Sequence, residues 1–318
     1  MTLFFVFLFV LLGQGALGAG EVRISTAAEL IQFSDNVNNG TSYFEATVFL
    51  DADLDFSGGL SETFEPIGVN DSNPFQGTFD GQGYTIRSLA SNSSLKYVGL
   101  FGYSEGMTIR NIVLDSSCSV ASFYNSSNYL YAGGVSGRCN SGYKACTFEN
   151  IINMANVSFS GKTSYTLHIG GIVGHLIAPT NQWTIVKNCA NYGAVTDSGE
   201  TGASYIGGIA GYSQVNLQIQ NCLNYGNTVK TKSISGGIYI GGTIGGNSGM
   251  LNIENCFSTG EISYIQSGHD SVGSIIGDAG STTSVINSFW TSKTGVVTGC
   301  ATGSPSLDNV IQVEVNAT

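Results

Sequence analysis

A short glycine-rich pattern recurs along most of the chain, and it constrains the fold more than any other feature. Its clearest copy reads Ile-Gly-Gly-Ile-Ala-Gly at 206–211. The first glycines of six copies stand at positions 99, 133, 170, 207, 241 and 273, which are 32 to 37 residues apart. A regular period in this range is typical of proteins built from stacked repeats, in which each unit packs on the next.

The second half of each repeat indicates what kind of unit is stacked. It ends in an asparagine that is preceded, two residues earlier, by an apolar residue, and the residue between them is polar in five of six copies. The asparagines are Asn111, Asn150, Asn188, Asn221, Asn255 and Asn287. Alternation of this kind predicts short, half-buried strands, and no window here has apolar residues at helical spacing.

Short strands that recur in the same order can stack in parallel, with successive turns about 4.8 Å apart. We therefore predict an all-β fold, a right-handed parallel β-helix of about six rungs over residues 95–293. Equivalent side chains then form columns, including an inward asparagine ladder. Cys189, Cys222 and Cys256 are expected to be buried and unbridged, because parallel side chains rarely adopt the dihedral of a disulfide. Cys139 and Cys146 are the better disulfide candidates.

The ends of the stack have their own signals. Residues 21–94 are expected to form an N-terminal cap and the first strands. Thr26 followed by Glu29 reads as a capping box, which predicts a short helix near 26–37 that covers the first rung. Residues 294–318 lose the period and are expected to form a C-terminal cap or tail.

The first residues predict export. Residues 1–20 combine an apolar run at 3–12 with small residues up to Gly20, which indicates a signal peptide. The run is too short to span a membrane, and no other segment approaches 18 apolar residues, so we expect no transmembrane segment in the mature chain. The predicted location is therefore secreted or at the extracellular surface.

Charge and sequons narrow the possible partners. The net charge of -11 argues against nucleic acid as a partner. Six Asn-x-Ser/Thr sequons suggest a glycosylated protein, and they begin at Asn39, Asn70, Asn92, Asn125, Asn156 and Asn316. Glycans or surface proteins are the expected partners.

The repeat motifs resemble the GLUG repeat of secreted and surface-attached adhesin-like proteins. The resemblance rests on Gly-Gly-Ile-Val-Gly at 170–174, on the Asn-Cys-x-Asn-x-Gly pattern, and on the lead-in Phe64-Glu-Pro-Ile-Gly with Phe75-Gln-Gly-Thr-Phe-Asp-Gly. It covers residues 22–303 and implies a β-helix that serves as a stalk or an accessory domain. Some such repeats accompany a zinc peptidase module, but this chain has no His-Glu-x-x-His.

Two pairs of tyrosines are the candidate binding residues. Tyr192 and Tyr225 occupy equivalent turn positions on successive rungs, and Tyr205 and Tyr239 do so before the Gly-Gly corner. A file of exposed tyrosines can stack on sugar rings or on a partner's surface. Alternatively, the rings simply pack on one another along the solenoid.

Other candidate sites carry weaker signals. Asp51, Asp53 and Asp55 alternate as calcium ligands can, but they also fit a strand with outward acids. His168 and His175 flank a Gly-Gly corner without a third zinc ligand nearby, so we expect surface or corner histidines. We predict no metal or other cofactor.

Parallel β-helices also carry polysaccharide lyases and hydrolases, which need paired carboxylates on adjacent rungs. The position before each asparagine holds no two neighbouring carboxylates, although loop acids remain open as candidates, namely Asp197, Glu200, Glu261 and Asp270. The predicted function is a non-catalytic, adhesive binding module. The alternatives are a carbohydrate-active enzyme and a purely structural extracellular stalk.

Overall fold

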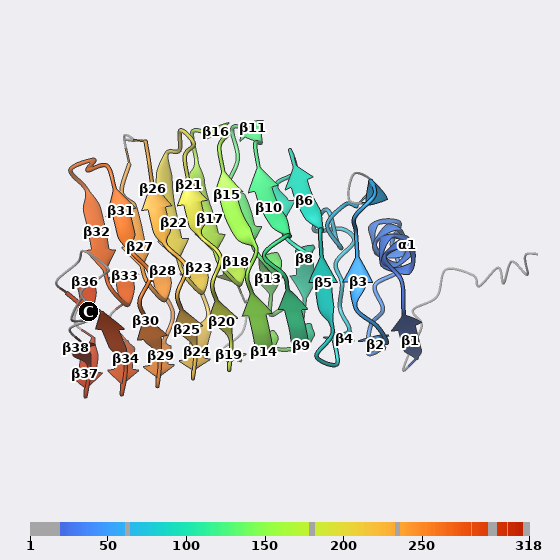
Figure 1. Cartoon of the computed structure of the whole chain (residues 1–318). Coiled ribbons are helices and arrows are strands. Elements are labelled where there is room, and N and C mark those ends of the chain that lie inside the picture. Colours follow the sequence, from blue (N-terminus) through green and yellow to red (C-terminus); the bar gives the residue numbers. More distant parts are fainter. Residues whose placement is uncertain are drawn as a thin grey trace, which may run out of the picture.

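A computed structural model shows a parallel β-solenoid of about seven turns, with a single helix among the residues it describes (Figure 1). The described residues are 20–313, apart from 61–63, 178–181, 233–235, 281, 292–297 and 304. The predicted parallel β-helix with a short helix is therefore confirmed. The predicted signal peptide lies outside the described residues except for Gly20.

Four parallel sheets run along the stack, and from β6 to β35 the chain visits them in the order 2, 3, 4, 1 in each turn. Sheet 1 contains β1 (Glu21–Ile24), β2 (Thr47–Leu50), β3 (Leu54–Asp55), β4 (Thr78–Asp80), β5 (Thr85–Arg87), β9 (Thr108–Leu114), β14 (Thr147–Asn153), β19 (Trp183–Lys187), β20 (Ala190–Asn191), β24 (Asn216–Gln220), β25 (Leu223–Asn224), β29 (Leu251–Glu254), β30 (Phe257–Ser258), β34 (Thr283–Ile286), β35 (Phe289–Thr291), β37 (Ser306–Asp308) and β38 (Ile311–Val313).

The other three sheets begin at β6, β7 and β8 and take at most one strand from each turn. Sheet 2 contains β6 (Ala90–Ser93), β10 (Ser119–Ser122), β15 (Asn156–Phe159), β21 (Val195–Asp197), β26 (Thr228–Lys230) and β31 (Ile262–Tyr264). Sheet 3 contains β7 (Tyr97–Val98), β12 (Leu130–Gly133), β17 (Thr166–Gly170), β22 (Ala203–Gly207), β27 (Ile238–Gly241) and β32 (Asp270–Gly273). Sheet 4 contains β8 (Phe101–Glu105), β13 (Ser136–Asn140), β18 (Val173–Ile177), β23 (Ala210–Ser213), β28 (Ile244–Asn247), β33 (Ile276–Asp278) and β36 (Cys300–Thr302). A short pair, β11 (Asn125–Ser126) and β16 (Lys162–Thr163), lies beside them.

The stack has two extended hydrophobic cores, and a third, small cluster is formed by Tyr97, Tyr103 and Tyr131. The larger core lies between sheets 1 and 4 and includes Ile219 and Leu176. The smaller core lies between sheets 2 and 3 and includes Val195 and Ile206. Sheets 3 and 4 meet on the sides that face away from both cores. Their backbones approach so closely that a Cβ on Gly137 would lie 2.7 Å from the backbone nitrogen of Val98, so only glycine fits there.

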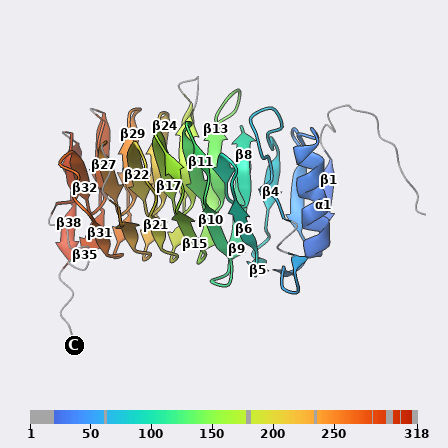
Figure 2. The same ribbon diagram turned by 90° about the horizontal axis from the view of Figure 1, so that it is seen from above.

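The N-terminal end is covered as predicted. Helix α1 (Ala27–Asn38) lies at this end of the stack, next to β1 (Figures 1 and 2). The capping box is present: the Glu29 amide donates to the Thr26 hydroxyl oxygen at 3.2 Å, and the Thr26 amide donates to the Glu29 carboxylate at 3.0 Å. Leu30 and Val37 are fully buried against the larger core, so the helix closes the stack at this end.

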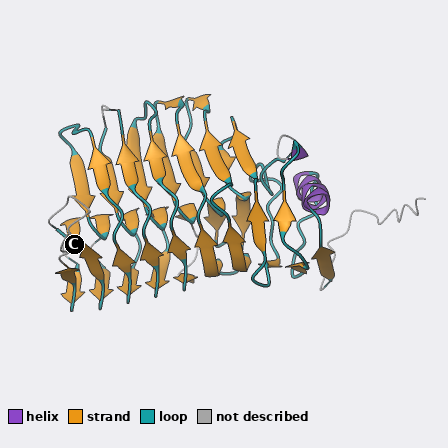
Figure 3. Cartoon of the chain, in the orientation of Figure 1, coloured by secondary structure: helices purple, strands orange, loops and turns teal. Residues whose placement is uncertain are grey.

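The other end of the stack finishes with a shortened turn. Strands β36, β37 and β38 pair in parallel with β33, β34 and β35 and add this turn (Figure 3). Its paired residues are only 24 positions apart at Ile276 and Cys300 and 22 at Ser284 and Ser306, so the period of 32 to 37 residues is lost. Strand pairing needs only backbone groups in register, and it does not require the glycine pattern by which we recognised the repeats.

The asparagine prediction is half right. The predicted asparagines form a ladder, because Asn150 donates to Asn111, Asn188 to Asn150, Asn221 to Asn188 and Asn255 to Asn221, each at 2.9–3.1 Å. They do not point inward, however. Each has a positive φ of 47–55°, which asparagine tolerates at a bend and which leaves the side chain at the surface. A second ladder, missed from sequence, is buried and runs through Asn153, Asn191 and Asn224.

Candidate functional site

The most exposed of the four predicted tyrosines are Tyr192 and Tyr225, which we call the outer pair. They occupy the turns that lead from β20 to β21 and from β25 to β26. Their rings stack with centroids 4.9 Å apart and planes 7° apart. They remain 50% and 41% exposed, so the pair packs on itself and still presents aromatic surface to solvent.

Tyr205 and Tyr239 also stack, at 4.3 Å, but they are half-buried rather than exposed as the sequence suggested. They belong to a cluster that fills the space between sheets 3 and 4, outside both hydrophobic cores. We call this cluster the aromatic notch. It comprises Tyr97, Tyr131, His168, Tyr205 and Tyr239 from sheet 3 and Tyr103, Arg138, His175 and Tyr212 from sheet 4.

Ring contacts run through the notch from turn to turn. Tyr131 stacks on Tyr97 at 5.4 Å and on His175 at 5.1 Å. His175 in turn lies 4.5 Å from His168. The guanidinium of Arg138 lies 4.8 Å from the centre of the Tyr131 ring, and the negative face of that ring stabilises the cation. Nζ of Lys96 also lies 5.0 Å from the centre of the Tyr97 ring, so the notch is a continuous aromatic stack with two cations against its rings.

The two histidines are buried, not at the surface as predicted, with exposures of 5% for His168 and 2% for His175. The prediction failed because the repeat alone does not show that sheets 3 and 4 face each other. Burial, aided by the nearby Arg138, lowers the pKa of His168 to about 3. Burial also puts the pKa of His175 well below its usual value, so both imidazoles are neutral at pH 7.

Several polar atoms of the notch are buried without a hydrogen-bond partner in the described structure. They are the Tyr97 hydroxyl, Nε of Arg138, Nδ1 of His168 and both ring nitrogens of His175. Gln214 lies close enough to His175 to oppose the lowering of its pKa in part, but it makes no hydrogen bond of acceptable geometry. Aromatic faces surround these atoms, so the notch is more apolar than its composition suggests.

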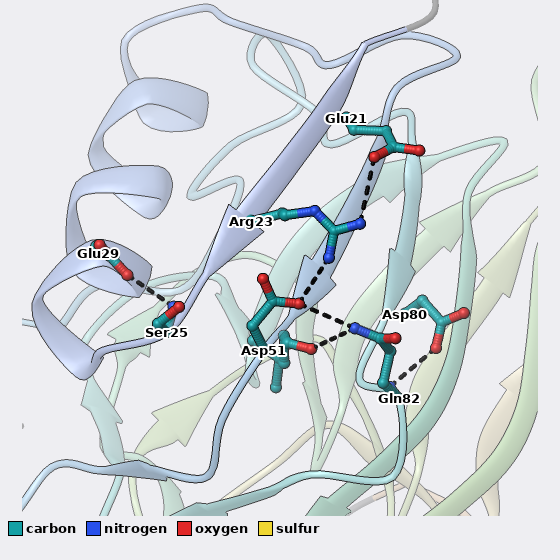
Figure 4. Close-up of polar contacts among 8 residues, drawn as sticks. Glu21, Arg23, Ser25, Glu29, Asp51, Asp80 and Gln82 are labelled. Atoms are coloured by element: carbon teal, nitrogen blue, oxygen red, sulfur yellow. Dashed lines mark hydrogen bonds and ion pairs between the residues drawn. The ribbon is translucent and has the colours of Figure 1, made fainter.

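The three alternating aspartates near the N-terminus bind separate partners. Asp51 accepts hydrogen bonds from Arg23 at 2.9 Å and Gln82 at 3.1 Å (Figure 4). Asp53 pairs with Arg87 at 2.9 Å, and Asp55 accepts from the Ser57 amide. Over the described residues, no group of three or more His, Cys, Asp or Glu side chains is placed to hold a metal ion.

The acids considered for catalysis do not converge either. In the column before the asparagines, Glu149 pairs with Lys187 at 3.0 Å and Glu254 accepts from Gln220 at 2.9 Å. Glu200 forms an exposed pair with Lys162. Asp197, which the sequence suggests is a loop acid, ends strand β21 and is fully buried against Lys230.

The remaining predicted residues are placed as follows. Cys139 and Cys146 are joined in a disulfide, whereas Cys189, Cys222 and Cys256 are buried free thiols. The sequon asparagines Asn39, Asn92, Asn125 and Asn156 are exposed and Asn70 is half-buried. Asn316 lies outside the described residues. No helix in the described part of the chain is long and apolar enough to cross a membrane.

Comparison with known proteins supports the fold. No family model matches the chain, and no curated protein matches it. Among solved structures, it is similar to the crystal structure of a "putative immunoglobulin A1 protease" from Bacteroides ovatus, with a TM-score of 0.61 and 21% sequence identity. The match covers 92% of this chain and 84% of the other. At this identity the likeness shows the shared fold alone.

Proposed function

We propose that the chain is a secreted or surface-associated, non-catalytic binding module that serves in adhesion, with glycans as the ligands of the outer pair. We further propose that its repeats are of the GLUG type. The observation that carries the binding proposal is the exposure of Tyr192 and Tyr225, whose rings are stacked and still half open to solvent.

The chemistry of the outer pair suits a sugar. The apolar face of a pyranose ring packs on an aromatic ring, and the tyrosine hydroxyl remains free to hydrogen-bond to sugar hydroxyls. The pair is built on consecutive turns of a rigid stack, so little conformational freedom is lost when a ligand binds. The repeats also supply a long surface, which suits an extended ligand better than a small concave pocket does.

The first experiment is a glycan array probed with the secreted protein, followed by titration of the strongest ligand. The double variant Tyr192→Ala/Tyr225→Ala is expected to bind that ligand at least about tenfold more weakly, because each aromatic contact contributes on the order of 1 kcal/mol. The far-ultraviolet circular dichroism of the variant should be unchanged, since both side chains lie at turns.

Phe123→Ala is the matched control, because Phe123 is as exposed as Tyr192, at 50%, but lies outside both tyrosine columns. This variant is expected to bind normally. An array without a specific ligand, or a double variant that binds as the unmodified protein does, would rule out the proposed site. Release of oligosaccharides from a polysaccharide, abolished by Glu261→Gln, would replace adhesion with the enzyme alternative.

A further inference from the structure

A lysine and an aspartate face each other inside the smaller core. Asp197 on β21 and Lys230 on β26 are direct neighbours in the register of sheet 2, one turn apart. Nζ of Lys230 lies 2.9 Å from Oδ2 of Asp197, and neither side chain has any exposed surface. In every other ion pair of the described chain, at least one side chain is 36% exposed or more, so this pair stands apart.

The neighbours of the pair are apolar above and below and polar on one side. Phe159 precedes Asp197 in the same column, and Tyr264 follows Lys230. From the facing strand β22, the Ser204 hydroxyl donates to Oδ2 of Asp197 at 2.6 Å and is itself 2.7 Å from the Thr201 hydroxyl. The Gly199 amide donates to Oδ1 of Asp197 at 2.9 Å.

Two full charges are unfavourable inside a core that water does not reach. A buried ion pair loses the hydration of both ions, and its mutual attraction compensates only partly. Burial also raises the pKa of Asp197. One proton can pass from Nζ to the carboxylate, which leaves a neutral amine beside a neutral carboxylic acid. An amine in this form is a nucleophile, and a protonated carboxyl group can lose its hydroxyl oxygen as water.

We propose that Lys230 and Asp197 are joined by an intramolecular isopeptide bond that links two adjacent turns of the stack. The Nζ lone pair attacks Cγ of Asp197, and the N–Cγ bond forms. The Cγ–Oδ2 bond then breaks, and Oδ2 leaves as water with its own proton and one proton from Nζ. The products are one amide and one water molecule, so neither an oxidant nor a reductant is required.

The surrounding groups assist each part of this step. The Gly199 amide stabilises the negative charge that develops on Oδ1, as in an oxyanion hole. The Gly199 carbonyl accepts a hydrogen bond from Nζ at 2.8 Å and so orients the amine. Ser204 and Thr201 lie beside the leaving oxygen and can pass a proton to it. Because the fold holds Nζ close to the carboxyl group, the two groups need not find each other by diffusion. The apolar core excludes water and so favours formation of the amide over its hydrolysis.

Mass spectrometry tests the bond directly. We compare the intact mass of the secreted, reduced protein with that of Lys230→Arg, which keeps the ion pair but removes the amine nucleophile. The substitution alone adds about 28 Da, and loss of the cross-link adds about 18 Da more, so the expected difference is about 46 Da. Glycans and processing are shared by the two proteins and cancel. A difference of only about 28 Da overturns the proposal.

Trypsin gives an independent measure. No lysine or arginine lies between Lys187 and Lys230, so an unlinked chain yields the peptide 188–230. A linked Lys230 is not cleaved, and the expected product is residues 188–232 with one water lost. Recovery of the free peptide 188–230 in full yield overturns the proposal, even if Lys230→Arg fails to fold. Ser204→Ala is expected to slow bond formation and leave a mixture of two masses, whereas unchanged formation would exclude the proton transfer by Ser204.

Discussion

The outer pair and the aromatic notch are both built from tyrosines one turn apart, yet their environments differ. Tyr192 and Tyr225 project from turns between sheets 1 and 2, where no other sheet faces them, and they remain about half exposed. Tyr131 projects from sheet 3 toward sheet 4 and is 5% exposed. The facing sheet, rather than the spacing of the tyrosines, therefore decides which column is buried and which stays exposed to solvent.

The largest expected effect separates the two columns by stability. Tyr131→Ala should destabilise the protein by about 3–5 kcal/mol, because it removes a buried ring that stacks on Tyr97 and His175 and supports the Arg138 cation. Chemical denaturation measures the change. Tyr192→Ala serves as the control and should have little effect. A cost below about 1 kcal/mol for Tyr131→Ala would mean that the notch does not hold sheets 3 and 4 together.

A smaller effect is the loss of stability at acidic pH that is caused by the buried histidines. The pKa of His168 is about 3 in the folded chain, against an ordinary value of 6.5. Above pH 6.5 the residue is neutral in both states and does not affect stability. As pH falls below 6.5, His168 becomes protonated in the unfolded chain but stays neutral in the folded chain. Stability is therefore progressively lost down to about pH 3. His175 acts in the same direction.

Between pH 7 and pH 5, His168 should contribute a loss of about 2 kcal/mol in the free energy of unfolding. Denaturation at the two pH values measures the total loss, to which other titrating groups also contribute. The variant His168→Gln isolates the histidine, since its stability should fall less over this range by about the same amount. Equal losses in the two proteins would show that His168 is accessible to protons in the folded state.

The smallest expected effect belongs to the outer pair. Tyr192→Ala/Tyr225→Ala should change the free energy of unfolding by less than about 1 kcal/mol, because half-exposed side chains at turns contribute little beyond their mutual stacking. The same denaturation experiment measures it. A loss above about 2 kcal/mol would place the outer pair with the notch as a structural element and would weaken its role as a binding surface.

The stack could be predicted from the sequence because each turn of the backbone needs the same residue types at its bends, so these residues recur at a regular spacing. The glycines at the Gly-Gly corners and the bend asparagines such as Asn188 mark places where the backbone permits few alternatives. The capping box at Thr26 was predicted for the same reason, since its hydrogen bonds are local. These features depend on neighbours in the chain and are therefore visible in it.

The features that sequence reasoning missed depend on contacts between sheets. The burial of His168 and the half-burial of Tyr205 follow from sheets 3 and 4 facing each other, and no single repeat contains that information. The same holds for the Asp197–Lys230 pair, whose members lie 33 positions apart and meet only after stacking. The buried asparagine ladder did leave a signal, because the residue three positions after Asn150, Asn188 and Asn221 is again asparagine, at 153, 191 and 224.

The surface asparagine ladder has a direction. From Asn255 to Asn111 every amide donates toward the N-terminal end, and the last N–H points at the carboxylate of Asp80, 2.9 Å away. Each amide polarises the next, so a row of dipoles that ends on a fixed anion is cooperative. The buried ladder runs the opposite way, since Asn153 donates to Asn191 and Asn191 to Asn224. The two rows are therefore antiparallel, and their fields along the axis of the stack oppose each other.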